Sequence, residues 1–355
     1  MLLFLFYISC TPTRQESSTI NTNTASVTKS SLVLYDVTIQ KSTVLPSASA
    51  YYAADLDGDT IDEKIYYDTT GLRTPRGLEQ INGGFQIAIR GDRNQDGNEE
   101  LIVAVGAGKG FRNAPMSLLS IQKDETTTLW TESKGSNQIS DIHIFDRKKI
   151  FFVHSHEKGM FAGSFLEEEN IRTVAKNRLA LRMYPKTENE VYVGRVYGDE
   201  PRSDGDLFLY KEGTPSVKIK NFRGIRALTL SDINNDGKKE LLVSDGWHYQ
   251  YGTMAQARVS LFTSDDDNPI PLADLPKEYT INRIEPHKKY ANVFLLQASR
   301  GAYVLSQSIF GWKSTPICSF SEGNNAVFRY EKDTTHVLCS GKQAKEYTLS
   351  ITAVP

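Results

Sequence analysis

After residue 31 the chain is a succession of short hydrophobic runs separated by polar turns. The runs are rich in Val, Ile, Tyr, Phe and Leu, and the breaks between them contain Gly, Asp, Asn and Pro. No stretch repeats with the helical period of about 3.6 residues. Because β-branched and aromatic residues favour strands and the breaks are typical of turns, the pattern predicts an all-β protein.

The runs group into units that share one plan. Each unit has a first strand, a turn, a hydrophobic second strand, a polar loop and further strands. The units are spaced by roughly 35 to 56 residues, which is about the length of a four-stranded propeller blade. They begin near Tyr51, Gln86, Gln138, Leu179, Ile225, Ile281 and Ala326. We therefore expect residues 31–355 to form a β-propeller of seven four-stranded blades.

The two ends of this region complement each other. The last unit contains about three strands, while the run from Ser31 to Gln40 belongs to no unit. If this N-terminal strand completes the final blade, no sheet edge is left unpaired where the ring closes. Truncating residues 31–40 should then destabilise the whole ring.

An acidic loop joins the first two strands of one unit. Asp92, Asn94 and Asp96 alternate along it, Gly97 permits a tight turn, and Glu100 ends it before a hydrophobic run. Calcium takes six to eight oxygen ligands, and the first half of an EF-hand loop uses the same spacing. Here, however, the last acid stands at position 9 and a strand follows. The pattern predicts a strand-loop-strand calcium site.

The acidic pattern occurs in two further units. The same offsets are held by Asp232, Asn234, Asp236 and Glu240, and by Asp55, Asp57, Asp59 and Glu63. The glycine position is kept as Gly237 in one loop but is Thr60 in the other. Because Asp, Asn and Gly are also ordinary turn residues, the alternative is that each loop is simply an acidic hairpin turn.

These three loops carry a family resemblance. With the apolar strands that follow them, they resemble the FG-GAP or VCBS-type repeats of integrin α-subunit propellers and of many exported bacterial proteins. The resemblance covers Asp55 to Glu63, Asp92 to Glu100 and Asp232 to Glu240. It implies a propeller with structural calcium, but no single activity, because propellers serve in binding, adhesion and catalysis.

A second set of loops joins the second and third strands of each unit. We expect these loops on the opposite face, close to the central channel, and they are dense in basic and aromatic residues. Aromatic rings stack on sugars while Arg and Lys bind carboxylates or sulfates, so a polar anionic or carbohydrate ligand fits. The candidate ligand-binding residues are Lys109, Arg112, His154, His156, Arg195, Trp247, His248 and Arg300.

Other interpretations of these residues stay open. Any one of them can be a solvated loop residue or an aromatic wedge between blades. A zinc site built from His154, His156 and His248 is a further alternative. The sequence contains no Ser nucleophile elbow, CxxC pair, phosphate loop or dinucleotide motif, so no catalytic residue is indicated.

The first ten residues, "MLLFLFYISC", are strongly hydrophobic but far shorter than the roughly 20 residues that span a membrane. They resemble the end of a bacterial lipoprotein signal, which makes Cys10 the expected lipidation site. The segment lacks a basic start and has Tyr7 where leucine is usual, so a cleaved or misassigned N-terminus is the alternative. Residues 11–30 are almost all polar and are expected to form a flexible tether.

The cysteines and the net charge bear on the compartment of the protein and on its partners. Export would allow Cys318 and Cys339 to form a disulfide, although two buried free thiols fit the sequence as well. The net charge of -2 gives no basic field for nucleic acid, so that partner is not expected.

The sequence as a whole predicts a calcium-binding propeller attached by a lipid anchor in the bacterial cell envelope, at the outer membrane or facing the periplasm. We expect it to bind a glycan, or an envelope or extracellular protein, without catalysis. One alternative is a lyase-like enzyme acting on a polysaccharide through His, Arg, Lys and Trp residues at the central channel. The other is a structural envelope protein.

Overall fold

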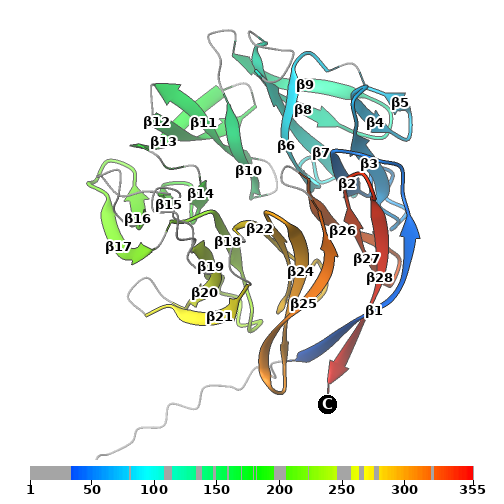
Figure 1. The fold of residues 1–355 in the computed structure, drawn as a ribbon. Coiled ribbons are helices and arrows are strands. Elements are labelled where there is room, and N and C mark those ends of the chain that lie inside the picture. The colour runs from blue at the N-terminus through cyan, green and yellow to red at the C-terminus, as the bar shows by residue number, and fades with distance from the viewer. Residues whose placement is uncertain are drawn as a thin grey trace, which may run out of the picture.

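The computed structural model describes residues 33–354, with gaps at 80, 108–113, 133–137, 147–148, 158–159, 169, 179, 181, 196–204, 223, 246–256, 264–267, 276–279 and 321–323. The described residues contain no helix and form seven four-stranded antiparallel sheets. Figure 1 shows the sheets arranged as blades around a ring. The predicted all-β propeller of seven blades is confirmed. Within this part of the chain, no helix of membrane-spanning length and apolarity occurs.

The first four blades follow one another along the chain, each running from an inner to an outer strand. Blade 1 contains β2 (Ala50–Ala54), β3 (Glu63–Tyr67), β4 (Leu72–Thr74) and β5 (Gly77–Leu78). Blade 2 contains β6 (Gly84–Gly91), β7 (Glu100–Gly106), β8 (Met116–Ile121) and β9 (Thr126–Glu132). Blade 3 contains β10 (Ile139–Phe145), β11 (Lys149–Glu157), β12 (Met160–Glu167) and β13 (Asn170–Arg178). Blade 4 contains β14 (Arg182–Pro185), β15 (Glu190–Gly194), β16 (Gly205–Lys211) and β17 (Val217–Phe222).

The last three blades continue this order until the chain returns to its start. Blade 5 contains β18 (Ala227–Ser231), β19 (Glu240–Asp245), β20 (Arg258–Phe262) and β21 (Ile270–Asp274). Blade 6 contains β22 (Ile281–Pro286), β23 (Val293–Ala298), β24 (Gly301–Ser308) and β25 (Gly311–Ser319). Blade 7 contains β26 (Ala326–Glu331), β27 (Thr334–Cys339), β28 (Lys345–Val354) and β1 (Leu34–Val44).

The hydrophobic core lies between the blades. Strands β7 and β8 are buried at every residue, because neighbouring blades cover both faces of the sheet. This is why the second strand of a unit is a continuous apolar run rather than an alternating one. By contrast, β1 at the rim buries one side chain, Val37, among its described residues.

The N-terminal strand closes the ring as predicted. β1 pairs antiparallel with β28, from Leu34 opposite Val354 to Val44 opposite Lys345. The side-chain amide of Asn292 in blade 6 donates to the carbonyl of Val33 at 2.7 Å. The first residues of the described chain are therefore held by two blades.

A disulfide joins the same two blades. Cys318 on β25 is bonded to Cys339 on β27. The sequence left this pairing open against two free thiols. The two cysteines are 21 residues apart, and closing a loop of that size stabilises a fold by about 3 kcal/mol in the chain-entropy model.

His287 lies buried at the junction of blades 6 and 7. Its Nδ1 accepts the backbone N–H of Lys289 at 3.0 Å, and its Nε2 lies 2.9 Å from Thr335 Oγ1. Burial lowers the pKa of His287 to about 3, and the positive charges of Arg90, Lys288 and Lys289 act in the same direction. The imidazole is therefore neutral in the folded protein.

We expect the stability of the protein to fall as the pH drops from about 6.5, the ordinary pKa of histidine, towards 3. Over this range the unfolded chain binds a proton at His287 that the folded chain does not bind, so acid favours unfolding. Each pH unit of this single group is worth up to about 1.4 kcal/mol. Urea unfolding of wild type and His287→Gln between pH 7 and pH 4 measures the effect. The variant should lose stability less steeply, and parallel pH profiles would exclude this role of His287.

Candidate functional site

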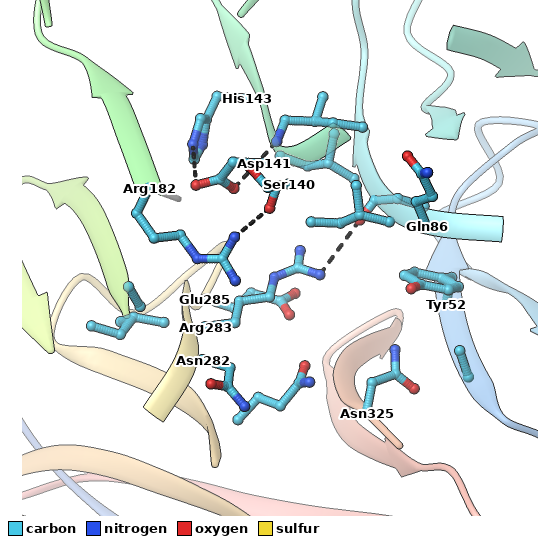
Figure 2. A pocket seen from close by; sticks show the side chains of 18 of the residues that line it. Tyr52, Gln86, Ser140, Asp141, His143, Arg182, Asn282, Arg283, Glu285 and Asn325 are labelled. Carbon is cyan, nitrogen blue, oxygen red and sulfur yellow. Dashed lines mark hydrogen bonds and ion pairs between the residues drawn. The ribbon is translucent and has the colours of Figure 1, made fainter. Parts of the chain in front are cut away.

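The ring encloses a central cavity of about 1110 Å³. Most of its wall is formed by the inner strands β2, β6, β10, β14, β18 and β22, together with Asn324 and Asn325 just before β26. Figure 2 shows polar side chains from several of these strands pointing towards one another across it. A cavity of this size holds a ligand of several sugar units or a comparable small molecule.

Arg90 bridges four blades near the end of the cavity that carries the loops between first and second strands. From blade 2, its guanidinium donates to Asp62 of blade 1 at 2.6 Å and to Glu285 of blade 6 at 3.1 Å. It also donates to the carbonyl of Phe328 in blade 7 at 3.1 Å and lies 4.7 Å from the centre of the Tyr330 ring. Since Asp62 is only 2% exposed, this is a largely buried ion-pair network.

Lys288 extends the same network. Its Nζ lies 2.8 Å from Glu99 and 3.3 Å from Asp62, which joins blade 6 to the loops of blades 2 and 1. The backbone N–H of Asp62 donates to the carbonyl of Tyr330, and the N–H of Tyr330 donates back to the Asp62 carboxylate. We call Asp62, Arg90, Glu99, Glu285 and Lys288 the floor network, because it spans this end of the cavity.

Basic side chains also line the cavity beyond the floor network. Arg182 on β14 donates through Nε to the carbonyl of Arg226 at 2.7 Å and through Nη1 to the carbonyl of Ser140. Arg283 on β22 reaches the carbonyl of Ala88 on β6 at 3.5 Å. These bonds hold Arg182 and Arg283 against backbone carbonyls of neighbouring blades.

Asp141 on β10 is the carboxylate that lies among these arginines. Its Oδ2 is 3.3 Å from Nε2 of His143, and its side chain faces Arg182 in Figure 2. Burial acts to raise the pKa of Asp141, but His143 and the nearby Arg182 and Arg283 together hold it below its ordinary value. The carboxylate is therefore ionised at neutral pH.

Side-chain amides complete the wall. Gln86 accepts the N–H of Ile139 at 2.8 Å, which ties blade 2 to blade 3. Asn325 accepts the N–H of Tyr51 at 2.8 Å and donates to its carbonyl at 2.7 Å, which ties blade 7 to blade 1. Amides both donate and accept, so groups of this kind suit a ligand with hydroxyls. The cavity is also lined by Gln138, Asn282, Gln297 and Asn324.

The three acidic loops lie where the sequence placed them, between β2 and β3, β6 and β7, and β18 and β19. In all three, the first carboxylate accepts the N–H of the sixth residue, with N–O distances of 3.0, 3.2 and 2.8 Å for Thr60 to Asp55, Gly97 to Asp92 and Gly237 to Asp232. The last carboxylate accepts the N–H of the second residue, at 2.7, 2.7 and 2.8 Å for Leu56 to Glu63, Arg93 to Glu100 and Ile233 to Glu240. The loops therefore share one conformation.

The donor set of the first two loops fits a hard cation. Asp55 Oδ1, Asp92 Oδ1 and Glu100 Oε1 are buried without a hydrogen-bond donor among the described atoms. Burial also raises the pKa of the closing carboxylates Glu63, Glu100 and Glu240. In the first loop, oxygens of Asp55, Asp57 and Glu63 all lie within 4.8 Å of one another. Buried carboxylate oxygens that lack donors are the ligands that calcium takes.

Thr60 stands in a conformation that favours glycine. Its φ is 71°, and the matching positions in the other loops are Gly97 at 93° and Gly237 at 85°. Because a β-branched residue is strained there, we expect Thr60→Gly to stabilise the protein by about 1 kcal/mol, after allowing for the greater freedom of glycine in the unfolded chain. Urea unfolding measures this. Thr60→Ala, which keeps a Cβ, should gain less stability. A Thr60→Gly variant that is less stable than wild type would show that Thr60 is not strained.

The loop-face residues predicted from the sequence are only partly described. Lys109, Arg112, Trp247 and His248 lie outside the described residues, as does the side chain of His156. The zinc hypothesis for His154, His156 and His248 therefore stays a prediction.

Three of the predicted residues are described, and none of them is among the described residues that line the cavity. His154 is 6% exposed, stacks on Phe152 at 5.0 Å and lies 3.1 Å from Ser164 Oγ, so it packs inside blade 3. Arg195 is 4% exposed and lies 3.9 Å from Asp206 in blade 4. Arg300 is exposed in the turn between β23 and β24. As ligand-binding residues they stay a prediction.

Sequence reasoning missed the residues that line the cavity. Arg182, Arg283 and Asp141 lie on first strands, whereas the sequence led us to expect ligand-binding residues only in the loops between second and third strands. The signal was a charged residue near the start of some first strands, as in "ISDIHIF" and "INRIEP". Inner strands of a propeller border the channel, so their polar positions mark its lining.

Comparison with known proteins does not identify a family for this chain. No protein-family model matches the chain, and no curated protein matches it. It is similar to a chain of the S. cerevisiae complex of Dbp5 bound to Nup159, Gle1, IP6 and ADP, with 9% identity, a TM-score of 0.46, and coverage of 90% of this chain and 95% of that chain. It is also similar to a putative oxidoreductase (glucose dehydrogenase) from Thermus thermophilus, with 12% identity, a TM-score of 0.45, and coverage of 77% and 99%. The resemblance to FG-GAP or VCBS repeats stays a prediction.

Proposed function

We propose that this chain is a calcium-binding propeller that acts as a non-catalytic binding module for a glycan. The ligand enters the central cavity at the end away from the floor network. Export and a lipid anchor at Cys10 place the module in the bacterial cell envelope, where glycans are accessible. A protein ligand and a purely structural role are the competing functions.

The observation that carries this proposal is the composition of the cavity. Amides and arginines from several blades line a space of about 1110 Å³, and the floor network crosses one end of it. Polar groups held in fixed positions around a concave space are typical of sites for polar ligands. A structural role alone needs no such lining.

Calcium bound in the acidic loops would also stabilise the floor network of the cavity. Asp62 and Glu99 belong to the floor network and directly precede Glu63 and Glu100, the closing carboxylates of two acidic loops. The two loops also contact each other, since the N–H of Glu99 donates to the carbonyl of Asp55 at 2.7 Å. A bound calcium ion would neutralise the crowded carboxylates. Holding these loops in one conformation therefore also holds the floor of the cavity.

A polysaccharide lyase is the second candidate, and the pair of Asp141 and His143 favours it. A histidine oriented by a carboxylate can abstract a proton, and a neighbouring arginine such as Arg182 can neutralise a uronate carboxylate. This activity would leave an unsaturated uronate, which absorbs ultraviolet light.

Incubating the protein with a panel of neutral and acidic polysaccharides in calcium separates these functions. Retention and product release are followed in the same samples, with ultraviolet absorbance reporting unsaturated products. We expect retention without new products. Turnover that is lost in His143→Gln would make the protein a lyase, and no retention by any polysaccharide would leave a protein ligand or a structural role.

Chelation tests the calcium part separately. Removing calcium should lower the melting temperature, and Asp96→Ala or Asp236→Ala should reproduce part of that loss. Asp124→Ala, an exposed acid in the turn after β8, is the matched control and should melt like wild type. If neither the chelator nor the loop variants change the melting temperature, calcium is removed from the proposal.

The lipid anchor has its own test. Membrane fractionation of cells that produce wild type or Cys10→Ser should find the wild type with membranes and the variant in the soluble fraction. Equal distributions would show that Cys10 is not lipidated.

A further inference from the structure

Arginines line the part of the cavity beyond the floor network. Three arginines from consecutive blades line it: Arg182 from blade 4, Arg226 just before blade 5, and Arg283 from blade 6. Among the described lining residues, Asp141 lies beside these arginines with its Oδ2 3.3 Å from His143 Nε2, and Glu285, two residues after Arg283, belongs to the floor network. Within the floor network, two cations pair with three carboxylates.

Arg283 is the clearest member of this group. It extends from β22 across the cavity to the carbonyl of Ala88 on β6, and no carboxylate within the described chain forms an ion pair with it. Figure 2 shows its guanidinium near the middle of the cavity, between Arg182 and Glu285. A guanidinium held in this way presents its remaining N–H groups to a ligand.

Arg182 is fixed by two carbonyl acceptors on different blades. Its bonds to the carbonyls of Ser140 and Arg226 use Nη1 and Nε, so the side chain is positioned before any ligand arrives. Arginine matches carboxylate and sulfate geometry because its N–H groups form a planar fork. A preorganised pair of arginines loses little conformational entropy on binding.

We propose that the cavity binds an acidic saccharide, and that Arg283 and Arg182 recognise its carboxylate or sulfate groups. The side-chain amides of the wall, such as Asn282 and Gln297, are placed to bind the sugar hydroxyls. This inference rests on the proposed function and names its ligand class. Asp141 keeps one edge of the cavity negative, which orients the anionic group towards Arg283.

Calorimetric titration with paired oligosaccharides tests the inference. The probes are oligogalacturonate, its fully methyl-esterified form, a sulfated carrageenan oligosaccharide and the matching desulfated form. We expect at least one acidic probe to bind, and its neutralised partner to bind about 10- to 100-fold more weakly, which is the effect of losing a charged hydrogen-bonded pair. The two acidic probes distinguish a carboxylate from a sulfate.

Variants locate the effect at the cavity. Arg283→Gln should weaken binding of the acidic probe by about 10- to 100-fold without changing that of its neutral partner, and Arg283→Lys should fall between. Arg172→Gln, at a rim position that pairs with Glu212, is the matched control and should bind like wild type.

Each outcome decides the inference. Equal binding of acidic and neutral probes, or wild-type binding by Arg283→Gln, would overturn the anionic ligand but leave a neutral glycan and the proposed function intact. If both acidic probes fail to bind while neutral polysaccharides are retained, the anionic ligand is likewise overturned and the proposed function remains. Failure of every glycan would overturn the proposed function as well.

Discussion

Deletion of residues 1–44 is expected to abolish the cooperative unfolding transition of the whole propeller. The deletion removes β1, which is the outer strand of blade 7 and continues along the chain into blade 1. Without it, β28 becomes an unpaired edge along its whole length, and the ring is open at one junction. Urea unfolding followed by circular dichroism measures the transition. Deletion of residues 1–32 keeps all described residues and should unfold like wild type.

Two single substitutions refine this result. Val37 is 3% exposed and faces the core, whereas Ile39, two residues later on β1, is 40% exposed. Val37→Asp buries a charge without a partner and should destabilise the ring by several kcal/mol, while Ile39→Asp should change stability by about 0.5 kcal/mol or less. A deletion variant that still unfolds in one sharp transition near wild-type denaturant concentrations would show that β1 does not close the ring.

Replacing Arg90 by methionine should cost about 3–5 kcal/mol of stability. The substitution keeps the apolar stem but leaves the carboxylates of Asp62 and Glu285 without their guanidinium, and breaking a buried pair on one side is strongly destabilising. Because Arg90 contacts blades 1, 6 and 7, the loss acts on the junction where the ring closes. Denaturant unfolding at neutral pH gives the difference in free energy.

An exposed pair provides the comparison for Arg90. Arg172 and Glu212 lie 2.6 Å apart with side chains 34% and 45% exposed, so Arg172→Met should cost about 1 kcal/mol or less. In Asp62→Asn, removal of Arg90 should cost less than in wild type, because the two residues act together. Equal costs for the Arg90 and Arg172 variants would show that the floor network does not hold the blades.

Most of the fold was predictable from the sequence, because blade length and hydrophobic runs are local features. The inner strands begin within three residues of the predicted starts, from Ala50 against Tyr51 to Arg182 against Leu179. The acidic loops were also placed correctly, since turn residues and the strands around them are contiguous in sequence.

The contents of the cavity were not predictable in the same way. Arg90 contacts Glu285 across 195 residues of sequence, and Arg283 reaches Ala88 over the same separation. Such pairs depend on ring closure and on which side of an inner strand faces the channel. His154 shows the opposite difficulty, because the sequence placed it in a loop, whereas it lies on strand β11 and packs inside blade 3.

Blocking the channel is the most direct test of a ligand inside it. Asn282→Trp places a large ring in the cavity, and Thr38→Trp places the same ring on the exposed face of β1 as a control. Retention on the polysaccharide that wild type binds is measured alongside the melting temperature. We predict that Asn282→Trp folds normally but is no longer retained, while Thr38→Trp is retained like wild type. Undiminished retention of a folded Asn282→Trp would contradict a binding site in the central cavity.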